Sequence, residues 1–171
     1  VKPGLLRGEV RPIGDLTMIL DCYNANPQSV TAALELLAGL PGASRRIAVL
    51  GSMLELGGRS RELHRTILAK ARSLPLDLVV VLGEFASAAT EFTDQRRPGV
   101  SSDPELITAS TLDDGYRALR SRLEGTETVL LKGSRGVALE TLIDRFEEDF
   151  GRGPAERETL KKAGAGPGLE A

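Results

Sequence analysis

The chain has 171 residues, enough for one sizeable hydrophobic core, so a single domain is expected. Its 22 Lys and Arg residues are balanced by 24 Asp and Glu, and the net charge of -2 gives no field that attracts nucleic acid. The single cysteine, Cys22, excludes an internal disulfide, and no cluster of Cys and His suggests structural zinc.

No apolar run approaches the roughly 20 residues that cross a bilayer, and the first residues lack the apolar core of a signal peptide. We therefore expect a cytosolic protein with no membrane segment. Patterned sequence follows almost directly after Val1, which hints at a piece of a longer polypeptide.

The first third of the chain predicts a hairpin, a helix and a buried strand. Residues 7–12 and 16–22 flank Gly14-Asp15, a turn that joins two antiparallel strands. Apolar residues at helical spacing predict a helix over Pro27 to Gly39. Residues 47–50 are continuously apolar, as expected of a strand that is covered on both faces.

Helices and strands alternate through the rest of the chain. Ser60 is expected to cap a helix whose apolar face includes Leu63 and Ile67. The segments that follow are, in order, a strand over 78–82, a helix over 85–92, a polar loop over 95–104, a short strand over 106–109, a helix capped by Thr111, a strand over 128–131 and a final helix that includes residues 139–146.

Strands that alternate with helices imply right-handed crossovers and parallel pairing. The sequence therefore predicts a Rossmann-like α/β fold, a mostly parallel, helix-covered sheet with the opening strand of the hairpin as an antiparallel edge strand. This domain is expected to cover residues 1–150. Residues 151–171 have almost no apolar periodicity and are expected to form a flexible tail.

Unusual polar residues follow three of the predicted strands, and ligands bind at the carboxyl ends of strands in open parallel sheets. Asn24 and Asn26 follow Asp21 after one strand, and Gly51-Ser52 follow another. Asn26 is interpreted as a helix cap before Pro27, in preference to a ligand contact. For Asp21, a functional role and a structural hydrogen bond remain equally open, because a carboxylate after a buried strand must be paired or exposed.

The third strand end is Lys132-Gly133-Ser134-Arg135-Gly136, which combines cations, glycines and an expected helix start. Its backbone N–H groups and Arg135 suit a carboxylate or phosphate. An equally weighted alternative is a glycine-rich turn with Ser134 as the cap and a solvated Lys132 and Arg135. No Walker A pattern occurs in the chain, so no complete ATP-phosphate site is predicted.

Four further residues are given structural interpretations from the pattern alone. Arg7 is expected to be a solvated surface residue. His64, the single histidine, is expected to be solvated or to cap a helix. Cys22 is expected to pack as a small apolar group, and Glu55 is expected to be a surface charge in a loop.

Several segments together resemble one family of bacterial enzymes. Residues 21–27, Asp-Cys-Tyr-Asn-Ala-Asn-Pro, resemble the D-S-Y-N-A-N-P signature of UDP-MurNAc-tripeptide:D-alanyl-D-alanine ligases, the MurF type of Mur ligase. Residues 29–37 are similar to S-x-x-A-A-L-x-x-L, residues 46–57 to R-I-A-V-L-G-D-M-L-E-L-G, and residues 132–136 match K-G-S-R-G. His64 falls where the family has Leu-His. The matches run in order from about Arg7 to Phe146.

The resemblance covers only the third, carboxy-terminal domain of that family, whose fold is Rossmann-like. It implies an enzyme that ligates D-alanyl-D-alanine to UDP-MurNAc-tripeptide through an acyl phosphate, in the cytoplasm of bacteria, during peptidoglycan precursor synthesis. In the full enzyme the amino-terminal domain holds the UDP-sugar nucleotide, and the central domain carries the ATP P-loop and the Mg ligands. The third domain closes over ATP, and this fragment alone is expected to be inactive, with no complete catalytic set.

The resemblance also implies roles for particular residues. Arg7 and Asp21 match positions that orient ATP when the domain closes, and Asn24 and Asn26 would lie beside the nucleotide. These are the expected ATP contacts. The residues expected on the side of the dipeptide or acyl phosphate are Lys132, Ser134 and Arg135.

Three positions depart from the family pattern: Leu20 and Ser52 each replace an Asp, and Cys22 replaces a Ser. Two alternatives therefore stay open at this point. One is the same domain of another Mur-type amide ligase, against which the Asn-Ala-Asn-Pro run argues. The other is a standalone, non-catalytic binding module that kept the fold and lost the reaction.

Overall fold

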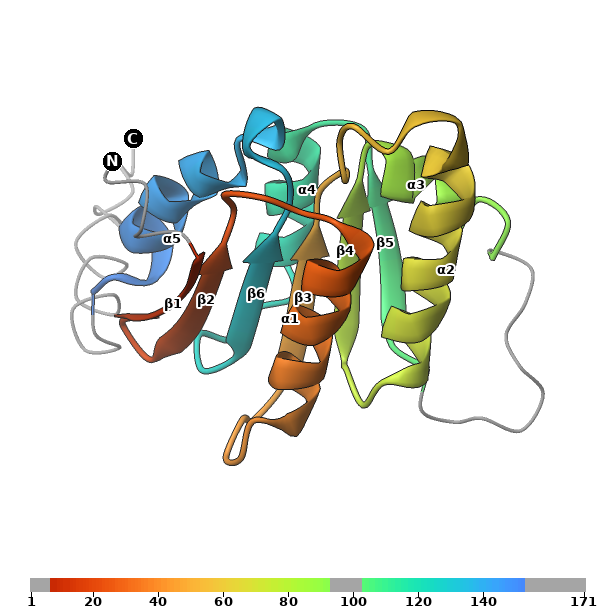
Figure 1. Ribbon diagram of the computed structural model, residues 1–171. Coiled ribbons are helices and arrows are strands. Elements are labelled where there is room, and N and C mark those ends of the chain that lie inside the picture. The colour runs from red at the N-terminus through yellow and green to blue at the C-terminus, as the bar shows by residue number, and fades with distance from the viewer. Residues whose placement is uncertain (1–6, 93–102, 153–171) are drawn as a thin grey trace, which may run out of the picture.

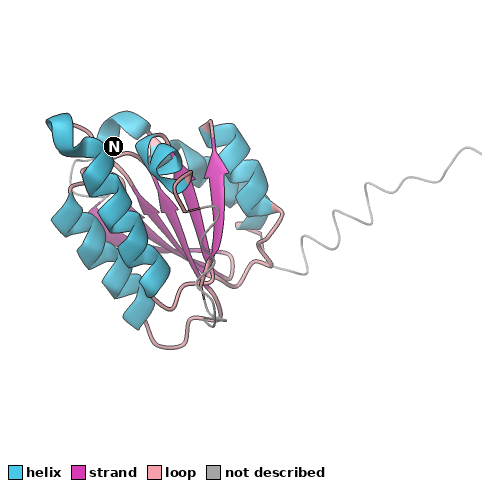
Figure 2. Ribbon diagram, turned by 90° about the vertical axis from the view of Figure 1, so that its right-hand side faces the viewer, coloured by secondary structure: helices cyan, strands magenta, loops and turns pink. Residues whose placement is uncertain are grey.

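A six-stranded sheet runs through the middle of the molecule and carries helices on both faces (Figures 1 and 2). The computed structural model describes residues 7–92 and 103–152. Its strands are β1 (Arg7–Ile13), β2 (Leu16–Asp21), β3 (Arg46–Leu50), β4 (Leu78–Leu82), β5 (Glu105–Ala109) and β6 (Thr128–Lys132). Its helices are α1 (Pro27–Gly39), α2 (Ser60–Ser73), α3 (Glu84–Ala89), α4 (Leu112–Arg120) and α5 (Leu142–Phe150), with short 3₁₀ turns η1 (Gly57–Arg59), η2 (Arg135–Val137) and η3 (Leu139–Thr141).

The strands lie in the order β1-β2-β6-β3-β4-β5. β1 pairs antiparallel with β2 at one edge, and every other neighbouring pair is parallel. This arrangement confirms the predicted Rossmann-like α/β fold and its antiparallel edge strand. The last strand of the sequence, β6, inserts between β2 and β3, so its carboxyl end lies between the ends of those two strands.

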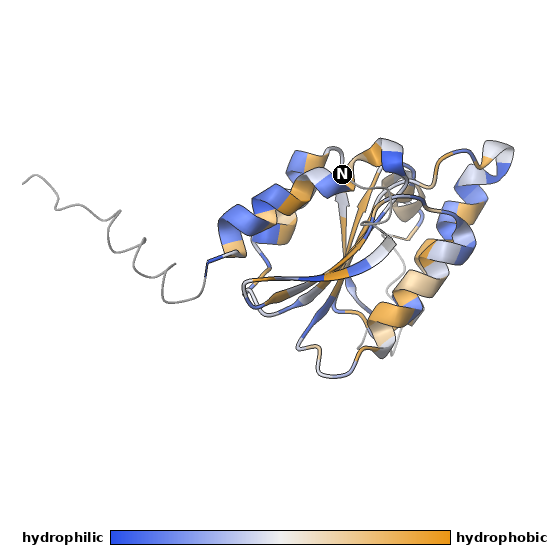
Figure 3. Cartoon of the chain, turned by 60° about the vertical axis from the view of Figure 1, so that its left-hand side comes forward, coloured by the Kyte–Doolittle hydropathy of each residue, from blue (hydrophilic) through white to orange (hydrophobic). Residues whose placement is uncertain are grey.

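Helices cover both faces of the inner strands, which explains why β3, β4 and β6 are largely apolar. All five residues of β4 and all five of β6 are buried. One hydrophobic cluster joins the sheet to α1, α2 and α3, and a second joins the other face to α4 and α5. Figure 3 shows mostly hydrophobic strands in the interior and helices that carry both hydrophobic and hydrophilic residues.

Most predicted elements are confirmed, and the helix from Pro27 to Gly39 has the predicted bounds. Thr111 caps α4, because its side chain accepts a hydrogen bond from the N–H of Asp114 at 3.1 Å. The prediction that Ser60 caps a helix is wrong: η1 leads directly into α2, and Ser60 is the first residue of that helix. The helix predicted over 85–92 ends earlier, at Ala89.

Two predicted segments fall largely outside the described residues. These are the polar loop over 95–104, of which only residues 103 and 104 are described, and the tail over 151–171, of which only residues 151 and 152 are described.

Candidate functional site

The three polar strand ends predicted from the sequence meet at one edge of the sheet. Asp21 pairs in register with Lys132, and Lys132 pairs with Leu50, directly before Gly51. The chain leaves β2 and β3 toward helices on one face, whereas it leaves β6 toward η3 and α5 on the other. Connections that diverge in this way open the crevice where doubly wound sheets bind ligands.

Lys132 connects the end of β6 to the loop after β2 through an ion pair and a hydrogen bond. Its Nζ atom lies 2.8 Å from Oδ2 of Asp21 and donates a hydrogen bond of 2.5 Å to the carbonyl oxygen of Asn24. The Lys132 side chain is 1% exposed and that of Asp21 is 20% exposed. Both alternatives for Asp21 thus keep support, since the carboxylate forms a structural ion pair and is also partly accessible. The interpretation of Lys132 as a solvated cation is wrong.

Ser134 connects all three strand ends. Its hydroxyl accepts a hydrogen bond from the N–H of Leu54 at 2.9 Å and contacts the carbonyl oxygen of Ala25 at 3.5 Å. Its own N–H donates to the carbonyl oxygen of Ser52 at 3.1 Å. The loops after β2, β3 and β6 are therefore held together by one buried residue.

No α-helix starts at residues 132–136, so that part of the prediction is wrong. Ser134 precedes the three-residue turn η2 and makes no side-chain cap bond. Gly133 serves close packing: a Cβ atom there would lie 2.9 Å from Cδ1 of Leu139 and 3.2 Å from Cα of Gly51. The segment is thus a closely packed turn, and an anion would be bound by the exposed side chain of Arg135 rather than by a helix N-terminus.

Arg135 is the exposed cation of this edge. Its guanidinium carbon lies 5.8 Å from the centroid of the Tyr23 ring, within the range of a cation–π contact. Among the described residues, no carboxylate forms an ion pair with Arg135. No role was predicted for Tyr23, although an aromatic residue in a polar loop directly after a buried strand is a usable signal.

Asn26 caps α1, which confirms the favoured interpretation. Its side-chain oxygen accepts from the N–H of Ser29 at 2.8 Å, and the hydroxyl of Ser29 accepts from the N–H of Asn26 at 3.1 Å. This reciprocal pair is a capping box, followed by Pro27 in the first turn. Asn24 and Asn26 are both exposed at the edge, so a ligand can reach them.

The backbone of Arg7 lies opposite Asp21 in the β1–β2 pair, next to an irregularity between Arg7 and Glu9. This pairing brings residue 7 to the same edge as the other candidates. The side chain of Arg7 lies outside the described part of the structure.

His64 is buried, so the prediction of a solvated or capping residue is wrong. Its Nε2 atom accepts from the N–H of Met53 at 2.9 Å, which leaves Nδ1 to donate to the carbonyl oxygen of Ser60 at 2.7 Å. Its ring packs edge-on against Phe85, with centroids 4.5 Å apart. His64 therefore holds the loop after β3 against α2 rather than reaching the strand-end edge as a catalytic group.

Ser52, at the position of an expected family Asp, also supports this loop. Its hydroxyl accepts from the first N–H of α3, that of Glu84, at 3.0 Å. Glu55 is exposed, as expected for a surface charge, and has a φ of 62°.

Cys22 packs in the core, as predicted, and is 1% exposed. Burial, with the nearby charges of Glu140 and Asp21, raises the pKa of its thiol to about 12. The thiol is therefore neutral at physiological pH and is a poor nucleophile.

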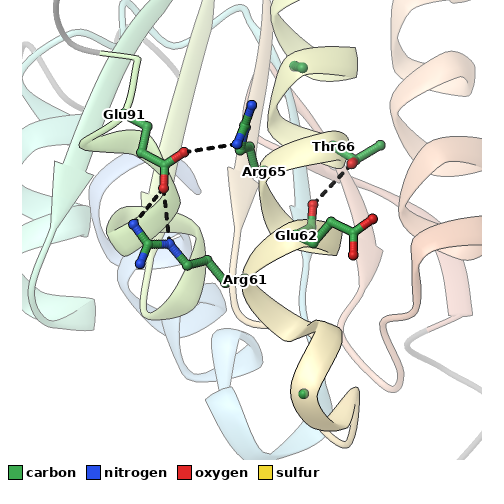
Figure 4. Close-up of a pocket in the computed structure, with 7 residues that line it drawn as sticks. Arg61, Glu62, Arg65, Thr66 and Glu91 are labelled. Carbon is green, nitrogen blue, oxygen red and sulfur yellow. Dashed lines mark hydrogen bonds and ion pairs between the residues drawn. The ribbon is translucent and has the colours of Figure 1, made fainter.

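A hollow of about 640 Å³ lies away from the strand ends, on the outer side of α2 (Figure 4). Figure 4 shows Arg61 and Arg65 turned toward Glu91, with nitrogen to oxygen distances of 2.6 and 3.4 Å. The charged side chains that line this hollow are already paired at the surface, so the hollow lacks the convergent unpaired groups of a binding site. The lining residues are Gly58, Arg61, Glu62, Arg65, Thr66, Ala69 and Glu91.

Within residues 7–92 and 103–152, no three His, Cys, Asp or Glu side chains gather in a way that holds a metal ion. The helices in these ranges are also too short or too polar to span a bilayer.

Comparison with known proteins gives a consistent result. The family model described as "Mur ligase, glutamate ligase domain" matches residues 6–135. The UDP-N-acetylmuramoyl-tripeptide--D-alanyl-D-alanine ligase of Treponema pallidum is 39% identical over 145 residues, which are 83% of this chain and 30% of that protein. The enzyme of the same name from Rickettsia prowazekii is 32% identical over 143 residues, 82% of this chain and 30% of that protein.

Solved structures agree with the curated relatives. MurF from Acinetobacter baumannii superimposes with a TM-score of 0.68 at 30% identity, over 84% of this chain and 30% of that one. MurF ligase from Thermotoga maritima in complex with ADP gives a TM-score of 0.64 at 26% identity, over 85% of this chain and 31% of that one. The chain thus spans about 30% of the length of these curated relatives and solved structures.

Proposed function

We propose, from the premise that this chain belongs to the Mur ligase family as a carboxy-terminal domain of the MurF type, that it receives D-alanyl-D-alanine and closes over ATP in a larger ligase. The intact enzyme would join the dipeptide to UDP-MurNAc-tripeptide through an acyl phosphate, in the bacterial cytoplasm. These 171 residues alone would be inactive, because the P-loop and the Mg ligands would belong to the central domain of the ligase.

The observation that carries this proposal is the exposed guanidinium of Arg135 at the edge where β2, β6 and β3 end. The Tyr23 ring lies within cation–π range of this guanidinium. No carboxylate within the described ranges forms an ion pair with it. Arg presents a planar set of N–H donors that matches a carboxylate or phosphate. Arg135 is therefore assigned to the dipeptide or acyl-phosphate side as a direct contact. Ser134 is assigned to the same side indirectly, because its hydrogen bonds hold together the loops that form it.

On the neighbouring side of the edge, Arg7, Asp21, Asn24 and Asn26 are assigned to ATP. Asp21 and the two amide side chains reach solvent at the end of β2, and the backbone of Arg7 pairs beside them. Charged and amide groups held on rigid strand ends can meet a nucleotide when a second domain closes against them. Closure would also exclude water from the acyl phosphate.

A chimeric ligase tests the proposal. The carboxy-terminal domain of the Treponema pallidum enzyme is replaced by this chain, and ATP-dependent formation of the ligated product is measured. Arg135→Ala should reduce kcat/KM for D-alanyl-D-alanine by about 10- to 100-fold, because a charge-assisted hydrogen bond is lost.

Arg65→Ala is the matched control, since it removes an exposed arginine of α2 that pairs with Glu91. This variant should keep the activity of the unaltered chimera. Equal activity of the Arg135→Ala and Arg65→Ala chimeras would remove Arg135 from the site, and a folded chimera that forms no product would support the non-catalytic module instead.

A further inference from the structure

Lys132 is a buried cation at the centre of the strand-end edge. Its side chain is 1% exposed and ranks among the largest fully buried side chains of the described residues. Burying an ammonium group is costly unless the group is paired and hydrogen-bonded. The partners of Lys132 therefore indicate what the residue does.

Both partners of Lys132 belong to the loop that leaves β2. Asp21 is the last residue of that strand, and its carboxylate lies 2.8 Å from Nζ. Asn24, three residues further along, accepts a hydrogen bond of 2.5 Å through its backbone carbonyl oxygen. The ammonium therefore fixes the start of the loop and its exposed middle at the same time.

We propose that Lys132 is a positioning residue, which holds the loop of residues 21–24 in its binding conformation without touching the ligand; this role rests on the proposed function. Tyr23 lies between Asp21 and Asn24 in the sequence, and its ring makes the cation–π contact with the guanidinium of Arg135. The placement of Arg135 thus depends on a loop that Lys132 holds from inside the protein.

The burial of Lys132 argues against direct contact with a ligand. Two of the three N–H donors of an ammonium group account for the contacts with Asp21 and Asn24. Arg135, three residues later, is exposed at the same edge. Of the two cations in the segment after β6, Lys132 thus holds the internal loop and Arg135 is left for the ligand.

Backbone order parameters from ¹⁵N relaxation test this role in the full 171-residue chain without any ligand. In the unaltered chain the amides of residues 23–25 should have order parameters of about 0.85, typical of rigid backbone. Lys132→Met should lower them toward about 0.6 or less, because the loop loses its internal partner. Unchanged values in a folded Lys132→Met variant would overturn the proposal.

Lys70→Met is the matched control, since Lys70 has a side chain that is 38% exposed and its Nζ lies 2.8 Å from a carboxylate oxygen of Glu35. It should leave residues 23–25 rigid. Asp21→Asn breaks the same ion pair from the other side and decides the matter where Lys132→Met does not fold. A mobile loop in Asp21→Asn supports the proposal, and a rigid one contradicts it.

Titration with D-alanyl-D-alanine separates positioning from direct contact. If the loop adopts its binding conformation about one tenth of the time, Kd rises about tenfold in each single variant. The Lys132→Met, Asp21→Asn double variant should then bind no more weakly than the weaker single variant, because both changes break the same ion pair between Lys132 and Asp21. If Kd of the double variant rises about a hundredfold, the two single losses are independent, and Lys132 contacts the ligand directly. If the unaltered chain shows no binding, the proposed function fails, whereas the order parameters still decide the role of Lys132.

Discussion

Buried polar residues fix the loops at both ends of the sheet. At the end where β6 begins, Glu127 is 1% exposed and its carboxylate accepts backbone N–H groups from Glu124, Gly125 and Thr126 at 2.7, 2.8 and 3.0 Å. Arg45 adds an ion-pair contact at 3.4 Å. Burial alone would raise the pKa of Glu127, but these backbone hydrogen bonds outweigh it and lower the pKa.

Glu127→Gln should lower the free energy of unfolding at pH 7 by about 1.5 to 3 kcal/mol, because the new NH₂ group faces backbone donors. Since the folded-state pKa of Glu127 is lowered, its contribution is fully present above the unfolded-state pKa of about 4.3 and disappears as the pH falls through the folded-state value. Denaturant unfolding from pH 7 to pH 3 should therefore show the difference between Glu127→Gln and the unaltered chain shrinking below about pH 4.3.

Glu124→Gln is the control, because Glu124 is exposed and contributes its backbone N–H rather than its carboxylate. It should stay within about 0.5 kcal/mol of the unaltered chain at every pH. A pH-independent difference for Glu127→Gln would show that its carboxylate charge is unimportant.

At the same scale, the sequence predicted which residues gather at the site but not which of them are buried. Parallel strands bring their carboxyl ends together, so the positions of Asp21 and Lys132 followed from the pattern. The burial of Lys132 and of His64 depends on contacts with Asn24 and Met53 in other loops. Those contacts exist only in the folded chain and have no periodic signal in the sequence.

The helices show where local sequence determines an element and where it does not. Asn26 and Thr111 cap α1 and α4 through hydrogen bonds to residues three positions ahead, so both could be read from the sequence. Ser60 looks similar but donates from its hydroxyl to Glu84 at 3.2 Å, at the start of α3. The turn η1 before it begins at Gly57, whose φ is 62°, and this turn replaces the expected side-chain cap.

Asn26→Ala should lower the free energy of unfolding by about 1 kcal/mol, because α1 loses the acceptor for the N–H of Ser29. Asn24→Ala is the control: its carbonyl oxygen still accepts from Lys132, so stability should change by less than about 0.5 kcal/mol. Chemical denaturation of the two variants measures both effects. Equal stability of the two variants would show that the capping box contributes nothing to folding.

At the scale of the whole molecule, one sheet with helices on both faces delivers three loops to a single edge. β6 lies between β2 and β3, so residues separated by more than a hundred positions in the sequence become neighbours. The alternation of helices and strands predicted the mostly parallel, helix-covered sheet but not the position of β6 between β2 and β3, and the Asn-Ala-Asn-Pro run indicated the family. The pattern could not show that Tyr23 lies beneath Arg135, since a side-chain contact between two loops depends on their exact geometry.

We propose that ligand binds at the edge formed by the ends of β2, β6 and β3 and not at the hollow on α2. Amide shifts of the chain during titration with D-alanyl-D-alanine and with ATP test it most directly. D-alanyl-D-alanine should shift the amide signals of Arg135 and its neighbours after β6, and ATP should shift those of Asp21 and Asn24. The signals of residues in the hollow on α2, such as Arg65, should stay unchanged. Saturable shifts centred on Arg61 and Arg65, with none at the strand ends, would contradict it.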